Sequence, residues 1–395
     1  MKILVADKLD PIKVAGLEAL GASIDLQPQL TAEELPEAIK DAEILIVRST
    51  KVTAQTMEAA GSLALIIRAG AGVNTIDVTT ASGRGIYVCN CPGTNTAAVA
   101  EVALAHIIAA DRRVVPASRD MLAGKWRKKE YGNARGLKGR TLGILGLGAI
   151  GKALAARAAG LEMNVVAWSR SLTEAAAAEL GIGYCASPEE VAAQADALSL
   201  HLAETPETKH LVNREFLAQM KDGAILVNTA RGGVVDTVAL KEAIRAKGLR
   251  VGLDVFENEP AGGEAVFEDT ELAEIAACTP HIGASTDQAA DAVGEEVVRI
   301  VAAYQASGMP RNAVNLRDKS TAVVNLVVQH LNKVGVLAGV LDGLRRNDIN
   351  VAEMQNTVFS GGQSASCTLK LDAIPPESVL ERMAENENII QLRMG

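Results

Sequence analysis

The stretch TLGILGLGAIG, from Thr141 to Gly151, decides the fold of the central part of this chain. A short apolar run is followed directly by the glycine pattern GxGxxG and then by an alanine-rich segment typical of a helix. In such a strand, turn and helix, Gly146 permits the tight turn, Gly148 lets the backbone approach a pyrophosphate, and Gly151 allows close packing of the helix. Because free N–H groups at a helix N-terminus attract anions, the stretch predicts a dinucleotide-binding site.

Apolar runs and helical patterns alternate on both sides of this stretch. They predict strands at 2–6, 43–48, 63–68, 85–90, 164–168, 196–201, 224–229 and 250–256. Strands that alternate with helices indicate parallel sheets. An alanine-rich pattern over 96–115, followed by Pro116, predicts one long helix that connects two domains.

The C-terminal part of the chain has a different order of elements. A polar stretch around 317–322 predicts a linker, and the residues beyond it give strand, helix, strand, strand, helix, strand. That order is typical of the ferredoxin-like arrangement. We therefore expect an α/β protein with two doubly wound parallel-sheet (Rossmann-like) domains and a C-terminal ferredoxin-like α+β domain.

Composition excludes several classes of protein. With 395 residues, 48% of them hydrophobic and 22% charged, the chain is expected to be globular with two or three domains. No apolar run reaches the roughly 18 uncharged residues of a membrane span. The net charge of −9 disfavours nucleic acid and anionic membranes as partners. Five scattered cysteines argue against a disulfide framework and predict a reducing, cytoplasmic location, and the lone close pair, Cys89 and Cys91, does not indicate a metal site.

Basic residues are concentrated in one segment, between Arg112 and Arg140. This segment contains ten lysines and arginines but only two acidic residues, Asp120 and Glu130, so its local net charge is +8. Two interpretations stay open: a solvated surface, or a field that attracts a small anion or a phosphorylated ligand.

The residues after the second strand of the central domain bear on the coenzyme. A dinucleotide site usually has an acidic residue there to hold the ribose hydroxyls, but this chain has Ser169 and Arg170. Arg170 could pair with the 2′-phosphate of NADP. Alternatively, Arg170 points to water and Ser169 binds the ribose of NAD.

Three residues at the ends of successive predicted strands suit acid–base and carboxylate chemistry. His281 could take the proton of an alcohol near pH 7, and Glu259 could orient the ring and raise its pKa. Arg231 offers a fork of donors for a substrate carboxylate. Because open α/β sheets bind ligands at the carboxyl ends of their strands, the three together predict a catalytic set.

The segments that carry these residues allow a family to be named. GLGAIG, NTARGGVVD (228–236), DVFENEP (254–260) and PHIGAST (280–286) resemble the signature segments of the D-isomer-specific 2-hydroxyacid dehydrogenases. More narrowly, IVRSTKVT (46–53), IIRAGAGVNTIDV (66–78), CNCPGTNTAAVAE (89–101) and GKWRKKEY (124–131) resemble the branch of that family that oxidises D-3-phosphoglycerate. The resemblance implies a discontinuous substrate-binding domain (1–96 and 284–316) around a dinucleotide-binding domain (97–283), followed by a third domain at 322–395.

The resemblance also implies roles for individual residues. Arg231 would hold the substrate carboxylate and carbonyl, while His281 acts as acid and base with Glu259 as its partner. The coenzyme NAD, or NADP through Arg170, would contact Gly146, Gly148, Ala149, Ile150, Gly151, Ser169, Arg170, Leu202, Thr229, Ala230, Asp254 and Ala284. The substrate would contact Arg48 and Arg68 through its phosphate, and Gly70, Ala71, Gly72, Val73 and Asn95 near its carboxylate.

The sequence departs from the family pattern at three positions. Ser169 replaces the usual acid, Ala71 stands where a small hydroxyl residue is common, and Ala203 stands where proline is expected. All three touch the coenzyme site, so coenzyme preference is the property they leave open.

The last domain resembles an ACT regulatory domain. HLNKVGVLAGV (330–340) followed by DIN (348–350) matches its ligand loop, and His330, Asn332 and Asn350 coincide with serine-contacting positions. Lys333-Val334 departs from the common Arg-Pro. The domain is therefore expected either to bind L-serine or to serve only in assembling the oligomer.

The function expected from these features is the NAD(P)-dependent oxidation of D-3-phosphoglycerate, the first step of serine synthesis, by a homodimer or homotetramer. One alternative is an NADPH-dependent glyoxylate or hydroxypyruvate reductase, which Ser169 and Arg170 would suit. An alternative of another class is a dinucleotide-sensing scaffold of the corepressor type.

Overall fold

The computed structural model describes residues 1–260, 265–317 and 320–395. The chain separates into two compact units, Met1–Asn315 and Leu316–Gly395. Residues 318 and 319 of the predicted linker lie outside the described residues. The finer division of the first unit into two domains stays a prediction.

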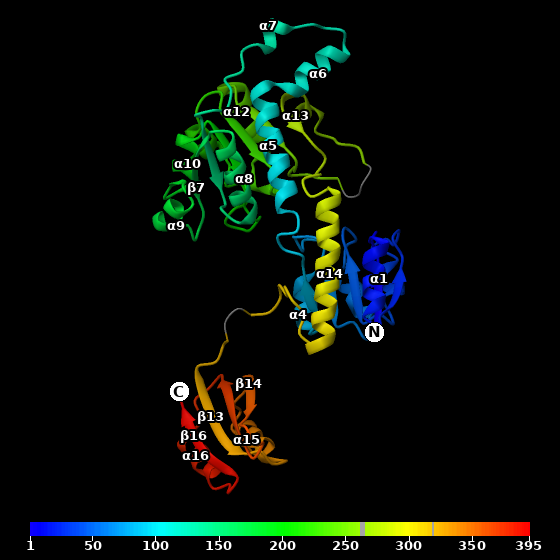
Figure 1. Ribbon diagram of the computed structural model, residues 1–395, viewed down its shortest axis with the longest axis vertical. Helices are drawn as coiled ribbons and strands as arrows, with labels where there is room; N and C mark the ends of the chain where they lie inside the picture. Colours follow the sequence, from blue (N-terminus) through cyan, green and yellow to red (C-terminus); the bar gives the residue numbers. More distant parts are fainter. Residues whose placement is uncertain (261–264, 318–319) are drawn as a thin grey trace. The chain divides into compact units, whose positions relative to one another are not determined.

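The first unit contains a five-stranded, fully parallel sheet in the order β2-β1-β3-β4-β5. Its strands are β1 (Lys2–Val5), β2 (Ser23–Leu26), β3 (Ile44–Val47), β4 (Leu65–Arg68) and β5 (Tyr87–Cys89). Leu17 and Ile300 belong to the core on one face of this sheet, and Leu35 and Met57 to the core on the other. The helices that carry these and neighbouring residues are α1 (Pro11–Ala19), α2 (Leu35–Ala38), α3 (Ala54–Ala59), α4 (Val78–Gly83) and α14 (Asp287–Ser307). Helix α14 therefore packs on the first sheet although it follows the second sheet in sequence (Figure 1).

The second sheet of the same unit has seven parallel strands in the order β12-β11-β10-β9-β6-β7-β8. The strand order reverses between β6 and β9, which is where doubly wound sheets open a crevice for ligands. The strands are β6 (Thr141–Leu145), β7 (Asn164–Trp168), β8 (Gly183–Tyr184), β9 (Ala197–Leu200), β10 (Ile225–Asn228), β11 (Arg250–Leu253) and β12 (Ala277–Cys278). The predicted alternation of strand and helix is thereby confirmed.

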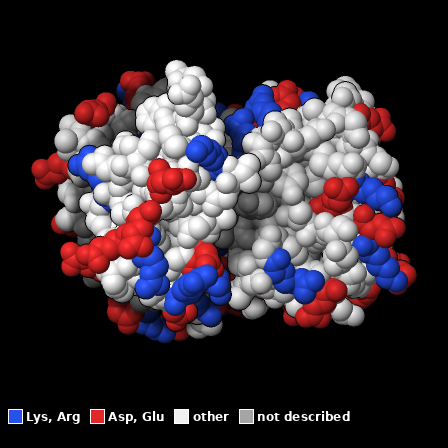
Figure 2. All heavy atoms as spheres, turned by 90° about the horizontal axis from the view of Figure 1, so that it is seen from below, with Lys and Arg blue, Asp and Glu red and all other residues white. Residues whose placement is uncertain are grey.

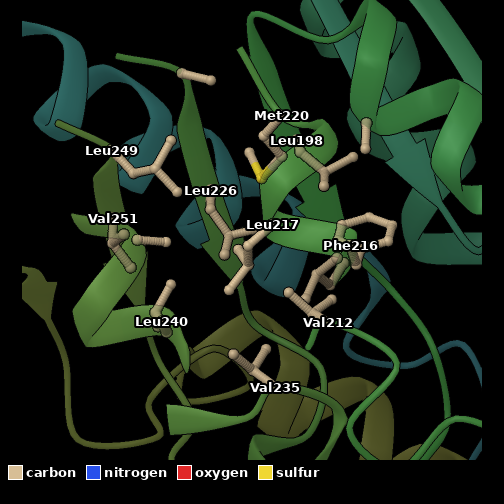
Figure 3. Close-up of a cluster of buried hydrophobic side chains, with 14 of the residues drawn as sticks. Leu198, Val212, Phe216, Leu217, Met220, Leu226, Val235, Leu240, Leu249 and Val251 are labelled. Carbon is tan, nitrogen blue, oxygen red and sulfur yellow. The ribbon is translucent and has the colours of Figure 1, made fainter. Parts of the chain in front are cut away.

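Helices cover both faces of the second sheet. Ile107 and Leu154 pack on one face, and Phe216, Leu217 and Leu240 belong to the cluster on the other, part of which Figure 3 shows. The helices around this sheet are α5 (Thr96–Arg112), α8 (Ala149–Gly160), α9 (Glu174–Glu179), α10 (Pro188–Gln194), α11 (Arg214–Gln219), α12 (Thr237–Lys247) and α13 (Thr270–Ile275), with a 3-10 turn at Gly232–Val234.

One long helix was predicted over 96–115, and the predicted position of its C-terminal end is wrong. Helix α5 ends at Arg112 because Arg113 adopts a left-handed conformation with φ of 53°. A second helix, α6 (Val114–Leu122), then begins, followed by α7 (Lys128–Tyr131). Pro116 lies in the first turn of α6, where its missing N–H costs no intrahelical hydrogen bond.

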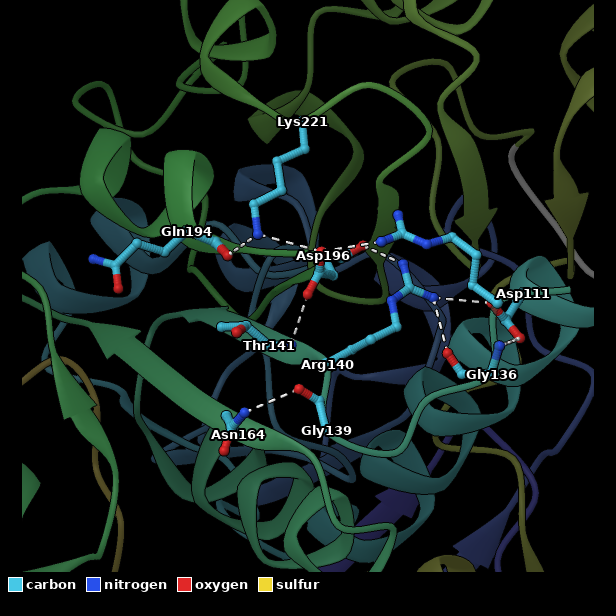
Figure 4. Close-up of polar contacts among 10 residues, drawn as sticks. Asp111, Gly136, Gly139, Arg140, Thr141, Asn164, Gln194, Asp196 and Lys221 are labelled. Carbon is cyan, nitrogen blue, oxygen red and sulfur yellow. Dashed lines mark hydrogen bonds and ion pairs between the residues drawn. The ribbon is translucent and has the colours of Figure 1, made fainter.

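A buried ion pair ties α5 to the amino end of the second sheet (Figure 4). Arg140 donates to Asp111 at 2.9 Å and to the backbone carbonyl of Asp196 at 3.1 Å. The side chain of Asp111 is 1% exposed, and its other oxygen accepts from the N–H of Gly136. At least one residue of the basic segment therefore has a structural role, because Arg140 forms a buried ion pair with Asp111.

The second unit is a four-stranded antiparallel sheet in the order β14-β15-β13-β16. Its elements are β13 (Val324–Leu331), α15 (Val336–Arg345), β14 (Val351–Val358), β15 (Ser364–Leu371), α16 (Glu377–Ala384) and β16 (Ile389–Met394). Leu326, Val328 and Leu369 form a core with Val340 and Met383 of the two helices. The predicted ferredoxin-like order is confirmed.

The surface and the helices give two further findings. On the face drawn in Figure 2, acidic and basic side chains are interspersed over the surface. Within the described ranges, no helix combines the length and the apolar character that crossing a bilayer requires.

Candidate active site

The glycine turn lies at the carboxyl end of β6, where the strand order of the second sheet reverses. Gly146 has a φ of 95°, and a Cβ there would collide with the carbonyl oxygen of His201. A Cβ on Gly151 would collide with the carbonyl oxygen of Gly146. Gly148, by contrast, has no atom within 4 Å of the position its Cβ would take. Two of the glycines are thus required by packing, while the third leaves open space at the start of α8.

Other residues predicted to contact the coenzyme gather around this turn. Leu202 lies beside Gly146, since its Cδ2 is 3.1 Å from the position of a Cβ there. Ala149 and Ile150 form the first turn of α8, whose first N–H groups have no partner within the helix. Among the described residues, the buried hydroxyl of Thr229 has no hydrogen-bond partner. An open helix N-terminus and an unpaired buried hydroxyl fit a polar ligand such as a dinucleotide.

The end of β7 carries Ser169, which is half-buried, and Arg170, which is exposed. Glu207, on the loop after β9, lies near Arg170. Hydrogen bonding with Thr205 lowers the pKa of Glu207 below its ordinary value, and the charge of Arg170 contributes to the shift. No sequence pattern pointed to this carboxylate, because Glu207 stands far along the chain from the expected acidic position.

His281 and Glu259 form a hydrogen-bonded pair, with Nδ1 of the histidine 2.7 Å from Oε2 of the glutamate. The hydrogen bond to Glu259 raises the pKa of His281, while burial opposes this. For Glu259, burial alone would raise the pKa. The hydrogen bonds from His281 and from the N–H of Phe256 outweigh burial and lower it. Glu259 therefore orients the imidazole ring of His281 and raises its pKa.

Asp254 holds the turn that carries His281. Its carboxylate is buried and accepts from the N–H of Ile282 and the N–H of Gly283, both at 2.8 Å. It also accepts from the hydroxyl of Thr279 at 2.6 Å. His281 itself has a φ of 53°, a left-handed conformation that is uncommon for a residue with a side chain. The Asp254 carboxylate thus braces the turn on both sides of the histidine.

Arg231 is positioned by two close backbone approaches. A Cβ on Gly232 would collide with the backbone carbonyl of Phe256, so the Arg231 loop can pack on the DVFENEP loop only with glycine there. Nη2 of Arg231 lies 2.7 Å from the position of a Cβ on Gly72. The guanidinium therefore reaches the 70–73 loop of the first sheet.

Arg48 and Arg68 lie together at the carboxyl ends of β3 and β4. Nε of Arg68 donates to the carbonyl oxygen of Arg48 at 3.0 Å. Burial lowers the pKa of Arg68, and the positive charges of Arg231 and Arg48 lower it further. Three guanidinium groups that repel one another make a region in which an anion would be stabilised.

One cavity of about 1300 Å³ brings most of these groups together. The predicted residues that line it are Arg48, Arg68, Gly70, Ala71, Asn95, Glu259, His281 and Ala284. Lys8, Lys51 and Asp291 also line it, although the sequence did not single them out. Residues from both sheets of the first unit therefore share one cavity, which can hold a small anionic substrate beside an acid–base pair.

The three predicted effector residues are not brought together within the second unit. His330 pairs with Ala365, which pairs with Val358 at one end of the sheet. Asn350 precedes Val351, which lies at the opposite end of β14. His330 is buried, whereas Asn332 donates to the carbonyl oxygen of Gly362 at 3.0 Å. Among the described residues, no group of three or more His, Cys, Asp or Glu side chains could hold a metal ion.

Comparison with known proteins adds a family model and curated relatives. The model of the D-isomer specific 2-hydroxyacid dehydrogenase NAD-binding domain matches residues 104–283. A D-3-phosphoglycerate dehydrogenase from Mycobacterium tuberculosis is 40% identical over 86% of this chain, which spans 63% of that relative. One from Methanocaldococcus jannaschii is 35% identical over 91% of this chain and 68% of its own length. A hydroxypyruvate reductase from Thermotoga maritima is 41% identical over 68% of this chain and 87% of its own length.

Solved structures agree with the fold of the first unit. The TT0316 protein from Thermus thermophilus superposes with a TM-score of 0.72 at 35% identity, covering 80% of this chain and all of its own. D-lactate dehydrogenase from Aquifex aeolicus, solved with NAD and lactic acid, has a TM-score of 0.67 at 29% identity and covers the same shares.

Proposed function

Because the chain belongs to the D-isomer specific 2-hydroxyacid dehydrogenase family, we propose that it oxidises D-3-phosphoglycerate to 3-phosphohydroxypyruvate with NAD as the coenzyme. This reaction is the first step of L-serine biosynthesis. The observation that carries the proposal is the cavity that His281 and Glu259 share with Arg48 and Arg68. An acid–base pair beside clustered guanidinium groups suits a 2-hydroxy acid with a second anionic group.

The coenzyme site fits a dinucleotide because Gly148 leaves the N-terminus of α8 open and Thr229 has a buried, unpaired hydroxyl. Gly148, Ala149 and Ile150 would hold the pyrophosphate, and Ser169 the ribose. A bound oxidised nicotinamide would supply the acceptor for the hydride that leaves C2 of the substrate. NAD is proposed because the family model that matches residues 104–283 is that of an NAD-binding domain.

The proton of the 2-hydroxyl goes to His281. Its Nδ1 is engaged by Glu259, so Nε2 remains to accept the proton while the C2 oxygen becomes a carbonyl. Arg231 is proposed to bind the carboxylate and to stabilise the negative charge that develops on the carbonyl oxygen. Arg48 and Arg68 are proposed to bind the phosphate, with Gly70, Ala71, Gly72, Val73 and Asn95 around the carboxylate.

A second candidate function is reduction of hydroxypyruvate or glyoxylate with NADPH. It is favoured by the identity to the hydroxypyruvate reductase and by the exposed Arg170 at the end of β7. The same His281 and Arg231 would serve it, with the keto acid protonated by His281. The two candidates differ in the contribution of Arg48 and Arg68 and in the coenzyme, on which Arg170 bears.

One matrix of activities tests both candidates. We expect turnover of 3-phosphoglycerate with NAD, and of phosphohydroxypyruvate with NADH, to exceed the corresponding rates with NADP and NADPH. Preference for glyoxylate with NADPH would favour the reductase. Coenzyme binding without turnover of any of these acids would instead favour a dinucleotide-sensing scaffold.

We further propose a homodimer or homotetramer in which L-serine binds between two copies of the second unit. His330 and Asn350 lie at opposite ends of one sheet, so a ligand that contacts both residues must bridge two sheets. Among the described residues, the edge strands β14 and β16 each pair with a neighbour on one side, and two copies can pair through the other side.

A further inference from the structure

A buried chain of hydrogen bonds runs from helix α5 to the turn that carries His281. Nε2 of His106, on α5, lies 3.0 Å from the hydroxyl oxygen of Thr279. The same hydroxyl lies 2.6 Å from the carboxylate of Asp254. His106 is 5% exposed and Asp254 is 1% exposed, so water does not replace these bonds. None of the catalytic steps above uses His106 or Thr279.

The chemistry of the three groups fixes the direction of the chain. A carboxylate can only accept, so the single hydroxyl proton of Thr279 goes to Asp254. The hydroxyl oxygen must then accept from His106, which requires the proton on Nε2 of the imidazole. Burial lowers the pKa of His106, which agrees with a neutral ring. His106 thus donates to Thr279 and Thr279 donates to Asp254, so the chain of hydrogen bonds has one direction, toward the turn.

A glycine in the second sheet provides the space for this chain of hydrogen bonds. A Cβ on Gly252, in β11, would be 2.6 Å from Cβ of His106, so glycine at this position admits the histidine. The ring then lies between α5 and the carboxyl end of the sheet. The placement is therefore specific to this helix and strand.

The far end of the chain reaches both sides of His281. Thr279 precedes the histidine, and its carbonyl oxygen accepts from the N–H of His281 at 3.0 Å. Asp254 accepts from the N–H groups of Ile282 and Gly283, which follow it. The left-handed conformation of His281 needs such support, because strained backbone persists only where its surroundings hold it.

We propose that His106 and Thr279 are positioning residues for His281. By fixing the Asp254 carboxylate, they hold the 279–283 turn so that Nε2 of His281 meets the substrate hydroxyl. The inference rests on the proposed role of His281 as acid and base, and it adds a link from α5 to that role.

The first test replaces the hydroxyl of Thr279 at nearly constant shape. In the full chain, Thr279→Val should lower kcat by at least about tenfold, since it removes a hydrogen bond to a charged group and leaves His106 unpaired. The KM for coenzyme should change less than about threefold, because the glycine turn is untouched. Thr279→Ser should restore kcat. Thr80→Val, which removes a hydroxyl bonded to Asp77 at 2.8 Å outside the site, is the matched control.

The second test needs no turnover. Amide hydrogen exchange of the segment around Ile282 and Gly283 should be faster in Thr279→Val than in the wild type or in Thr279→Ser. In the wild type, ¹⁵N NMR of the histidine side chains should show His106 protonated on Nε2, with His106→Gln used for assignment. Because the NMR measurement is made on the wild type, it does not depend on whether the valine variant folds.

The outcomes separate this inference from the proposed function. Wild-type kcat and exchange in Thr279→Val, equal impairment of the valine and serine variants, or a His106 proton on Nδ1 would each overturn the positioning role. An inactive wild type in which the exchange and NMR results are as expected would instead overturn the proposed function and leave the hydrogen-bonded chain supported.

Discussion

At the residue scale, the pairing of His281 with Glu259 predicts a pH dependence. The hydrogen bond to Glu259 raises the pKa of His281, so the protonated form needed to reduce the keto acid persists to higher pH. Glu259→Gln removes the carboxylate charge and should lower that pKa. The alkaline limb of the kcat/KM profile for reduction should therefore move to lower pH, and the acidic limb for oxidation should move the same way.

Steady-state rates measured between pH 5 and pH 10 check this shift, in roughly the window of histidine titration. His281→Ala removes the acid–base group altogether, so its kcat should fall about 100-fold or more while coenzyme binding survives. An unchanged profile in Glu259→Gln would count against the assigned partnership.

The buried ion pair of Arg140 and Asp111 predicts a loss of stability. Arg140→Ala leaves the Asp111 carboxylate, 1% exposed, without its charged partner and should cost about 3–5 kcal/mol. Arg157→Ala, which breaks a more exposed pair with Glu101, should cost less than about 1 kcal/mol. Both tryptophans lie in the first unit, so urea unfolding followed by tryptophan fluorescence reports on that unit. Equal losses in the two variants would show that burial is not the cause.

Some residues of the cavity could be predicted from the sequence and others could not. His281 and Glu259 follow strands of one sheet, and parallel strands bring their carboxyl ends to one edge. Lys8 and Lys51 lack such a pattern, because a lysine on a loop is usually solvated. His106 is a lone histidine in an alanine-rich helix, and only the structure connects it to Thr279.

At the scale of elements, different glycines of the turn between β6 and α8 serve packing and ligand binding. Gly151→Ala places a Cβ against the carbonyl of Gly146 and should destabilise the first unit by about 1–3 kcal/mol. Gly148→Ala meets no atom within 4 Å, and its φ of −76° suits alanine, so the free energy of unfolding should barely change. The Kd for NADH should nevertheless rise about tenfold or more in Gly148→Ala, since the Cβ occupies the space of the pyrophosphate.

Urea unfolding and a fluorescence titration with NADH make this comparison. Unimpaired NADH binding by a stably folded Gly148→Ala variant would contradict the assigned coenzyme site.

The order of strands and helices was predictable because short apolar runs and alanine-rich helical patterns alternate clearly in the sequence. The break between α5 and α6 was not, because alanine-rich periodicity continues through Arg113, whose left-handed conformation no local residue type requires. Pro116 was misinterpreted as a stop for the same reason: it suits the first turn of a new helix equally well.

At the scale of the whole molecule, the two compact units have separate cores and should be separable in function. A chain ending at Asn315 should keep coenzyme-dependent turnover and lose any inhibition by L-serine. In the full chain, Asn332→Ala and Asn350→Ala should each weaken that inhibition, although the two residues lie at opposite ends of one sheet. Titration of turnover with L-serine, using D-serine as the control, measures both effects. Full inhibition of the shortened chain would refute the assignment.

The net charge of −9 also takes on a different meaning at this scale. It disfavoured anionic macromolecules as partners, yet Arg48, Arg68 and Arg231 form a local positive cluster. A small anion experiences that local field more than the distant surface charges, which salt screens. Substrate choice should therefore depend on these three residues.

The most direct measurement of the central claim compares two keto acids that differ only in their phosphate. The ratio of kcat/KM for phosphohydroxypyruvate to that for hydroxypyruvate, with NADH, isolates the contribution of Arg48 and Arg68. Two charge-assisted contacts should make this ratio about 100 or more in the wild type, and Arg48→Ala should reduce it by at least about tenfold. A wild-type ratio near one, or a ratio unchanged by Arg48→Ala, would contradict the proposed substrate.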